Sequence, residues 1–127
     1  MTGTPGAAER RRLLLAEDDD DVAGAYAKAF AGHGFSVSRA RNGQEAVAIV
    51  QSLPALAAAV VDLVLPGVGG LDVVRAIRQR HPACRIVAVT GLGQPATERL
   101  FRESGADAFL AKPVELAVLL EAVGSAE

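Results

Sequence analysis

The segment at residues 57–65, AAAVVDLVL, is the most continuous apolar run in the chain and decides the fold. Apolar residues at nearly every position, rather than at every second one, predict a strand buried on both faces, as strands of parallel sheets are. Asp62 lies inside this run and is therefore predicted to be largely buried. Because a buried carboxylate is strongly unfavourable unless it is paired or bound to a metal, Asp62 is a candidate functional residue.

Apolar runs on both sides of this segment alternate with segments of helical period. Further strands are predicted at residues 13–16, at the polar, edge-like FSVSRA of residues 35–40, at RIVAVT of residues 85–90 and at DAFLA of residues 107–111. Apolar residues spaced by three and four positions predict helices from Val22 to His33, Ala46 to Leu53, Val73 to Ile77, Thr97 to Ser104 and Leu116 to Val123. Strict alternation of strand and helix predicts an α/β fold with one parallel sheet and right-handed crossovers.

Length and composition predict a single domain. The chain has 127 residues, 50% of them hydrophobic, which suffices for one core but not for two. A net charge of -2 argues against direct nucleic-acid binding. Because no apolar run approaches the roughly 20 residues that span a bilayer, and no signal peptide is evident, we expect a cytoplasmic protein without membrane contact. We expect a flexible tail at residues 1–10, the domain at residues 11–124, no effector domain in this chain, and a buried or inert thiol at Cys84.

Charged and polar residues stand at the ends of four predicted strands. Glu17 and Asp18 follow the first, Asp62 lies in the third, Thr90 ends the fourth and Lys112 follows the fifth. Except for Asp62, each has an ordinary explanation when read singly, such as a solvated loop or a surface charge. Because the carboxyl ends of parallel strands meet at the edge where ligands of such folds bind, we expect these residues to converge on one site.

Three carboxylates gathered at one place require a cation. At separations of about 4 Å each pair repels by roughly 1 to 4 kcal/mol. A site made only of oxygen ligands favours magnesium, whereas zinc would require histidine or cysteine, and His33 and His81 are expected at helix ends instead. The other acids of the run, Asp19 to Asp21, are predicted to include the cap of the first helix.

The remaining groups suit a phosphoryl group. Magnesium, the Lys112 ammonium and the Thr90 hydroxyl would neutralise its charge and donate hydrogen bonds to it. The nucleophile would be a carboxylate that forms an aspartyl phosphate, and Asp62 is the best placed.

These motifs, in this order and spacing, resemble the receiver domain of two-component response regulators, the CheY-like family. The resemblance covers nearly the whole chain and rests on LLLAEDD at residues 13–19, VVDLVLPGVGGLDVV at residues 60–74, VAVTG at residues 87–91 and GADAFLAKP at residues 105–113. It implies a flavodoxin-like (βα)5 three-layer sandwich with strand order 2-1-3-4-5. It also implies a phosphoacceptor that contributes to its own phosphorylation and dephosphorylation rather than an ordinary enzyme.

The resemblance also assigns roles to individual residues. Asp62 corresponds to the phosphoacceptor, and the magnesium ligands would be Glu17, Asp18, Asp62 and the backbone carbonyl of Val64. Lys112 would contact a phosphoryl oxygen next to a cis peptide before Pro113, while Thr90 and Phe109 would be the switch residues. Phe109 replaces the commoner tyrosine, which excludes a switch hydroxyl, and Gly69 stands where the family often has aspartate.

The resemblance implies partners as well. The phosphoryl donor would be a sensor histidine kinase or a phosphotransfer protein, and the surface of the fourth helix, fifth strand and fifth helix would change on activation. Val114 and Val118 are expected on the outer side of the last helix, as a docking surface for an output partner or a second copy.

Val64 and Leu92 cannot orient a water by hydrogen bonding, which predicts slow self-dephosphorylation.

Other classes of protein fit less well. A phosphatase of haloacid-dehalogenase type needs an aspartate two positions after the nucleophile, where this chain has Val64. A dinucleotide-binding loop would need a glycine where Asp72 follows GVGG. A receiver-like interaction module that is never phosphorylated stays open as an alternative, although the complete set of acids, Thr90 and Lys112 weighs against it.

Overall fold

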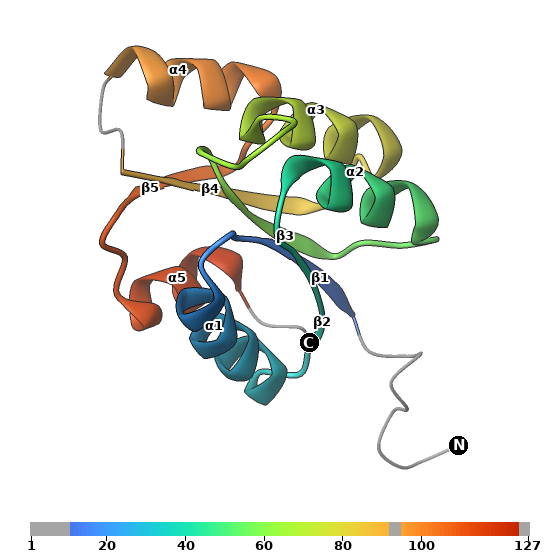
Figure 1. The fold of residues 1–127 in the computed structure, drawn as a ribbon, viewed down its shortest axis with the longest axis vertical. Helices are drawn as coiled ribbons and strands as arrows, with labels where there is room; N and C mark the ends of the chain where they lie inside the picture. The colour runs from blue at the N-terminus through green and yellow to red at the C-terminus, as the bar shows by residue number, and fades with distance from the viewer. Residues whose placement is uncertain (1–10, 92–94, 125–127) are drawn as a thin grey trace.

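The computed structural model describes residues 11–91 and 95–124. Within these residues five strands alternate with five helices (Figure 1). They are β1 (Arg12–Ala16), α1 (Asp20–Gly32), β2 (Ser36–Ala40), α2 (Gly43–Ser52), β3 (Ala58–Asp62), α3 (Gly70–Arg80), β4 (Arg85–Thr90), α4 (Pro95–Ser104), β5 (Ala108–Ala111) and α5 (Leu116–Val123). Every predicted strand and helix is confirmed, while the predicted tail at residues 1–10 and the residue Leu92 lie outside the described part.

The strands form one parallel sheet in the order β2-β1-β3-β4-β5, which confirms the predicted topology. The polar strand β2 lies at an edge, and β3 lies at the centre with all of its residues buried. The apolar run that contains Asp62 is therefore the middle of the sheet, as its composition predicts.

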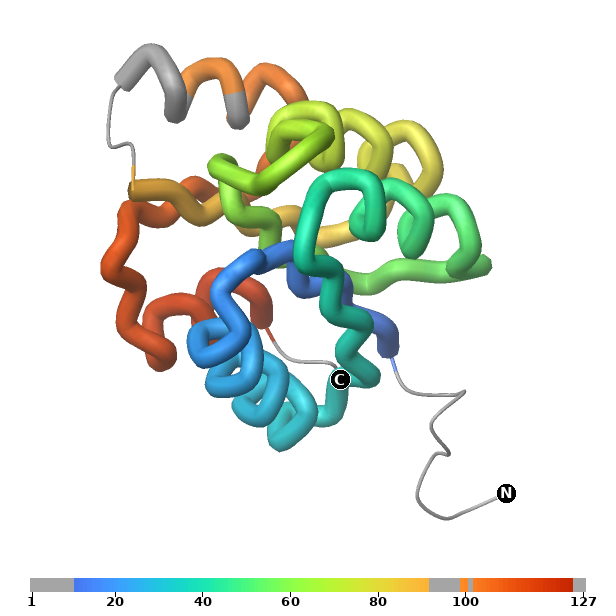
Figure 2. The backbone as a smooth tube through the Cα atoms, in the orientation of Figure 1, coloured from blue at the N-terminus to red at the C-terminus, as the bar shows by residue number. Residues whose placement is uncertain are grey.

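Helices cover both faces of the sheet and make three layers (Figure 1): α1 and α5 lie on one face, and α2, α3 and α4 on the other. The trace in Figure 2 shows α1 beside α5, and these two helices contact each other. Side chains of β3 alternate between the two cores, with Ala59 and Val61 on the side of α2 and α3, and Ala58 and Val60 on the side of α1 and α5. This two-sided burial is why the strand tolerates no polar residue before Asp62.

The acidic run after β1 includes the start of a helix. The Asp19 carboxylate accepts hydrogen bonds from the backbone N–H groups of Asp21 and Val22, both at 3.0 Å, and so caps α1. The cap satisfies two donors that would otherwise lack a partner in the first turn. The predicted cap within Asp19 to Asp21 is confirmed.

The environment of the single cysteine agrees with the sequence prediction. Cys84 is buried, and burial raises the pKa of its thiol to about 12, which leaves it protonated and unreactive near neutral pH. No helix in residues 11–91 and 95–124 is long and apolar enough to span a membrane.

The start of the last helix corrects two predictions about which of its neighbouring residues are buried. Val114 lies before α5, because the backbone of the N-cap residue Glu115 is extended; Val114 is half-buried and packs against the core under α1 and α5 rather than on an outer face. Leu116, predicted to be in the core, has an exposed fraction of 38%, whereas Leu119 is fully buried. Val118 is 46% exposed, as predicted.

The helix α3 begins at a glycine that provides no side-chain cap. Gly69 has an extended backbone, and a Cβ built there would meet nothing within 4 Å. We expect Gly69→Asp to raise the free energy of unfolding by about 0.5 kcal/mol, because a carboxylate can accept from the first-turn N–H groups. Urea denaturation would measure it. Gly69→Ala is the matched control and should not stabilise, so equal stability of the two variants would contradict a capping effect.

Candidate functional site

The carboxyl ends of the strands bring the predicted site residues to one edge of the sheet. Glu17 follows β1, Asp62 is the last residue of β3 and Lys112 follows β5. Glu17 and Asp62 are buried, with exposed fractions of 3% and 5%. Residues far apart in the chain therefore converge as the parallel topology predicts.

Lys112 lies between the two buried carboxylates. Its Nζ is 2.6 Å from Asp62 Oδ2 and 3.2 Å from Glu17 Oε1. Burial by itself would lower the pKa of Lys112, but the hydrogen bonds and charges of Asp62 and Glu17 outweigh it, and the pKa is raised. Lys112 is therefore a cation in a fixed position, and its ammonium group donates a hydrogen bond to Asp62.

The carboxylates have defined partners on each oxygen. Asp62 Oδ1 accepts the backbone N–H of Val64 at 3.0 Å, and Glu17 Oε2 accepts that of Asp19 at 3.3 Å. Burial raises the pKa of Glu17, and the charge of Asp62 adds to this, although hydrogen bonds from Asp19 and Lys112 act in the opposite direction. Burial is therefore the main reason that the charged form of Glu17 is disfavoured, with the charge of Asp62 second.

The geometry suits a divalent cation. Carboxylate oxygens of Glu17, Asp18 and Asp62 all lie within 4.8 Å of one another, and Asp18 is exposed, which leaves an open side. Hard oxygen donors of this kind select magnesium or calcium rather than zinc. The histidines serve as helix ends, as predicted: His33 Nδ1 lies 3.0 Å from the Ala29 carbonyl oxygen, and His81 Nε2 lies 2.9 Å from that of Val50.

The two predicted switch residues lie behind this edge. Thr90 is fully buried at the end of β4, and its carbonyl accepts the N–H of Lys112 at 2.7 Å. Phe109 in β5 is half-buried and packs against the core on the side of α2 and α3. The peptide between Lys112 and Pro113 is cis, as predicted.

The loop after β3 is held by the start of α2, a contact that sequence reasoning missed. The N–H of Gly43 donates to the Pro66 carbonyl at 3.1 Å, and Gln44 Oε1 accepts the N–H of Val68 at 3.4 Å. A Cβ at Gly43 would lie only 1.7 Å from the Val68 carbonyl oxygen. Glycine is thus required for the close approach, and no local signal in the sequence identifies the partner loop.

Arg39 in β2 is a second residue that the sequence patterns did not indicate. Its Nε donates to the Glu17 carbonyl at 3.0 Å, and its Nη1 lies 2.9 Å from Asp20 Oδ1. The hydrogen bond from Arg39 to Asp20, together with the charges of Arg39 and Arg41, lowers the pKa of Asp20. A charged residue near the end of an edge strand has a solvated surface as its ordinary explanation, so only the tertiary contact singles it out.

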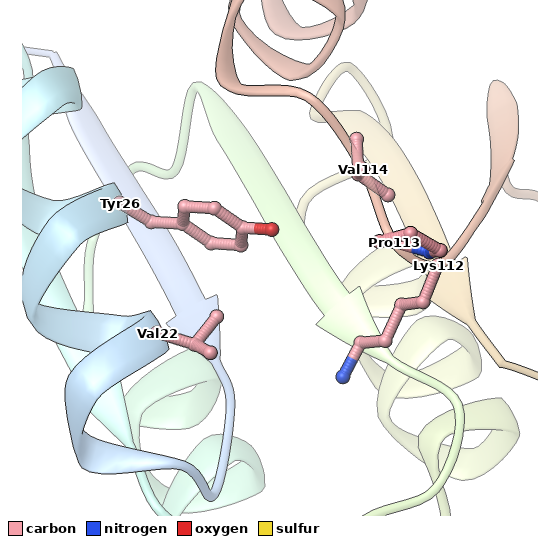
Figure 3. A pocket seen from close by; sticks show the side chains of 5 residues that line it. All are labelled: Val22, Tyr26, Lys112, Pro113 and Val114. Atoms are coloured by element: carbon pink, nitrogen blue, oxygen red, sulfur yellow. The ribbon is translucent and has the colours of Figure 1, made fainter.

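A hollow of about 360 Å³ opens beside Lys112 (Figure 3). Val22 and Tyr26 of α1 line one side, and Lys112, Pro113 and Val114 line the other, with the Tyr26 hydroxyl pointing across the gap. Burial raises the pKa of Tyr26, and the charge of Glu17 adds to it. The side of the site next to α1 is therefore open, largely apolar and within the field of the carboxylates.

The chain is similar in sequence to known signalling proteins over most of its length. The family model of the response regulator receiver domain matches residues 13–124. The photosynthetic apparatus regulatory protein RegA of Cereibacter sphaeroides is 45% identical over 89 residues, which are 70% of this chain and 48% of RegA. A cyclic di-GMP phosphodiesterase of Thermotoga maritima is 37% identical over 86 residues, 68% of this chain and 23% of that protein. The chain thus spans about half of RegA and about a quarter of the phosphodiesterase.

The fold of the chain is also similar to solved structures of response regulators. A response regulator of Burkholderia pseudomallei, solved with a phosphorylated aspartic acid, a calcium ion and citrate, has a TM-score of 0.83 and 29% identity over 90% of this chain and 66% of its own. A CheY-like receiver domain of Methanospirillum hungatei has a TM-score of 0.83 and 25% identity over 89% of this chain and 90% of its own.

Proposed function

This chain belongs to the response regulator receiver domain family, and from that premise we propose that Asp62 accepts a phosphoryl group from a sensor histidine kinase or a phosphotransfer protein. Receiver domains are phosphoacceptor signalling domains of two-component systems rather than ordinary enzymes. The observation that carries the proposal is the lysine ammonium 2.6 Å from the Asp62 carboxylate, beside two further acids. We propose that residues 11–124 form the receiver unit. We also propose that the protein is located in the cytoplasm, where such kinases act.

Phosphoryl transfer to Asp62 would require few groups. A carboxylate oxygen of Asp62 attacks phosphorus, and the phosphorus–nitrogen bond of the donor histidine breaks, so that the nitrogen keeps the electron pair. Lys112 then pairs with a phosphoryl oxygen in place of the carboxylate oxygen it now contacts. Thr90, fully buried behind the edge, would supply a hydroxyl to the same group.

We propose that Glu17, Asp18, Asp62 and the Val64 carbonyl would hold Mg²⁺. The bound ion would neutralise part of the charge that the phosphoryl group brings among the carboxylates. The three acidic side chains fit this role because their oxygens lie within 4.8 Å of one another. The Burkholderia relative was solved with a calcium ion, and we propose magnesium as the ion that this chain binds.

The signal would leave through the surface of α4, β5 and α5. Movement of Thr90 toward the phosphoryl group would leave space for Phe109 to move inward, and this shift alters the outer surface. Leu100 of α4, Leu116 and Val118 are exposed by 49%, 38% and 46% and are available to an output partner or to a second copy.

Treating the full chain with acetyl phosphate tests the function directly. We expect an acid-stable, hydroxylamine-labile adduct that forms with Mg²⁺ but not when EDTA is present from the start, and that maps by peptide mass spectrometry to the segment that contains Asp62. Beryllofluoride should give the corresponding change in oligomeric state or in the surface of α4, β5 and α5. A chain that binds Mg²⁺ but forms no adduct with either reagent would instead be a receiver-like module that is never phosphorylated.

The adduct is expected to decay slowly because the side chain next to it is apolar. Val64 is 58% exposed beside Asp62 and cannot orient a water, while the second residue assigned to this effect, Leu92, lies outside the described residues. Val64→Asn should speed decay by about threefold to tenfold, the effect of one new hydrogen bond of roughly 1 kcal/mol. Loss of the adduct over time in magnesium buffer measures it. Val64→Ala, which adds no hydrogen bond, should decay more slowly than Val64→Asn.

A further inference from the structure

Arg39 contacts both ends of the loop that presents the first two carboxylates. Its Nε donates to the carbonyl of Glu17 at 3.0 Å, and its Nη1 pairs with Asp20 at 2.9 Å. Glu17 is the first residue after β1, and Asp20 is the first residue of α1. One guanidinium therefore spans the whole β1–α1 loop, and Asp18 lies between its two contacts.

Strand β2 holds the Glu17 peptide from both sides. The N–H of Glu17 donates to the Ala40 carbonyl at 3.0 Å, and its carbonyl accepts from the neighbouring residue Arg39. The Glu17 backbone cannot rotate without losing one of these bonds. Its carboxylate is held at the same time by Lys112 and by the N–H of Asp19.

Stability alone does not account well for Arg39. Its side chain is 20% exposed, and its Nη2 is buried with no hydrogen-bond partner among the described protein atoms. Leaving a buried donor unpaired costs roughly 1 to 3 kcal/mol. The nearby Arg41 is 62% exposed and lies 3.5 Å from the same Asp20 oxygen, so a second cation already faces this carboxylate. The contact that distinguishes Arg39 is the one to the Glu17 carbonyl.

We propose that Arg39 is a positioning residue for the divalent-cation site: it fixes the β1–α1 loop in the orientation in which Glu17 and Asp18 face Asp62. The inference rests on the proposed function and deepens it. The planar guanidinium can bond a carbonyl and a carboxylate at once, which a lysine ammonium at this position cannot do in the same geometry. Contacts that orient metal ligands typically contribute 10-fold to 100-fold in metal affinity.

Titration calorimetry of the full chain with MgCl₂ would test the role of Arg39. The proteins are wild type, Arg39→Lys, Arg39→Ala and Arg41→Ala, compared at a temperature where circular dichroism shows each to be folded. We expect both Arg39 variants to bind Mg²⁺ at least about tenfold more weakly. Arg41→Ala removes a charge near the same carboxylate without touching the loop carbonyl, and its affinity should stay within about twofold of wild type.

The outcomes separate positioning from charge and from stability. Wild-type affinity in Arg39→Lys would overturn the proposal, because only the positive charge would then matter; so would tighter binding by Arg39→Ala. A lower free energy of unfolding with unchanged Mg²⁺ affinity would reduce Arg39 to a structural residue. Arg39→Lys keeps the positive charge at a partly exposed position. If Arg39→Ala does not fold, the Mg²⁺ affinity of Arg39→Lys tests the proposal by itself. If wild-type protein binds no Mg²⁺, the proposed metal site is overturned as well. If wild-type protein forms the phosphoryl adduct and the Arg39 variants bind Mg²⁺ as tightly as wild type, only the role of Arg39 is overturned.

Discussion

Substituting Asp62→Asn is expected to abolish phosphoryl incorporation from acetyl phosphate. The amide that replaces the carboxylate carries no negative charge and is a poor nucleophile toward phosphorus, so the adduct cannot form at this position. The fold should persist, because Lys112 keeps its contact with Glu17 at 3.2 Å when the Asp62 charge is lost. Intact-mass measurement after incubation with Mg²⁺ and acetyl phosphate should show the adduct in wild type and none in the variant.

A matched control comes from the same acidic run. Asp21 is exposed in the first turn of α1, and its backbone N–H rather than its carboxylate makes the cap contact with Asp19. Asp21→Asn removes one negative charge near the site but no group that faces Asp62, so it should still form the adduct. An adduct of equal yield on Asp62→Asn would mean that another carboxylate, such as Asp18, is the acceptor.

Gly43→Ala is expected to lower the free energy of unfolding by about 2 kcal/mol or more. The added Cβ would lie 1.7 Å from the Val68 carbonyl oxygen and 2.5 Å from its carbonyl carbon, and backbone atoms cannot move aside as a flexible side chain would. Relief requires the start of α2 to separate from the loop after Asp62, which breaks the bond from Gly43 to Pro66. Overpacking of this kind typically costs about 1 to 3 kcal/mol.

The control for this variant has the opposite expected effect. Gly24 lies in the interior of α1, is exposed, and a Cβ there would meet nothing within 4 Å. Gly24→Ala should therefore stabilise the chain by roughly 0.5 to 1 kcal/mol, the usual difference between the two residues within a helix. Urea denaturation of both variants measures the difference, and equal effects would contradict the close approach at Gly43. The adduct on Gly43→Ala should also form more slowly, because the loop that carries Val64 is released.

Local patterns were enough to predict the order of the elements and most of the site. The apolar run before Asp62 predicted a central strand because both faces of β3 are buried. The acids Asp19 to Asp21 predicted a helix start, and the structure shows that Asp19 is the cap, since its carboxylate reaches N–H groups two and three residues on. The acids, Thr90 and Lys112 were expected together because the ends of parallel strands meet at one edge. The structure brings Lys112, Glu17 and Asp62 into contact there.

The last helix shows where local patterns fail. Val114 and Leu116 are both apolar and adjacent to the helix, and its periodicity alone placed Leu116 inside and Val114 outside. The structure places them the other way, because Val114 precedes α5 and the extended backbone at Glu115 turns Val114 toward the core under α1. The side on which a residue near a helix end lies depends on where the helix begins, and packing against another element sets that point.

The sequence by itself determined the (βα)5 order, the central buried strand and the set of acids, lysine and threonine at the strand ends, since these follow from periodicity and residue type within short windows. The tertiary structure alone decided which residues hold that set in place: Gly43 against the loop after Asp62, and Arg39 across the β1–α1 loop. Each of these contacts joins parts of the chain that have a whole helix or strand between them, α1 in one case and β3 in the other. Its strength depends on distances of a few ångströms between groups whose residue types, taken singly, are ordinary.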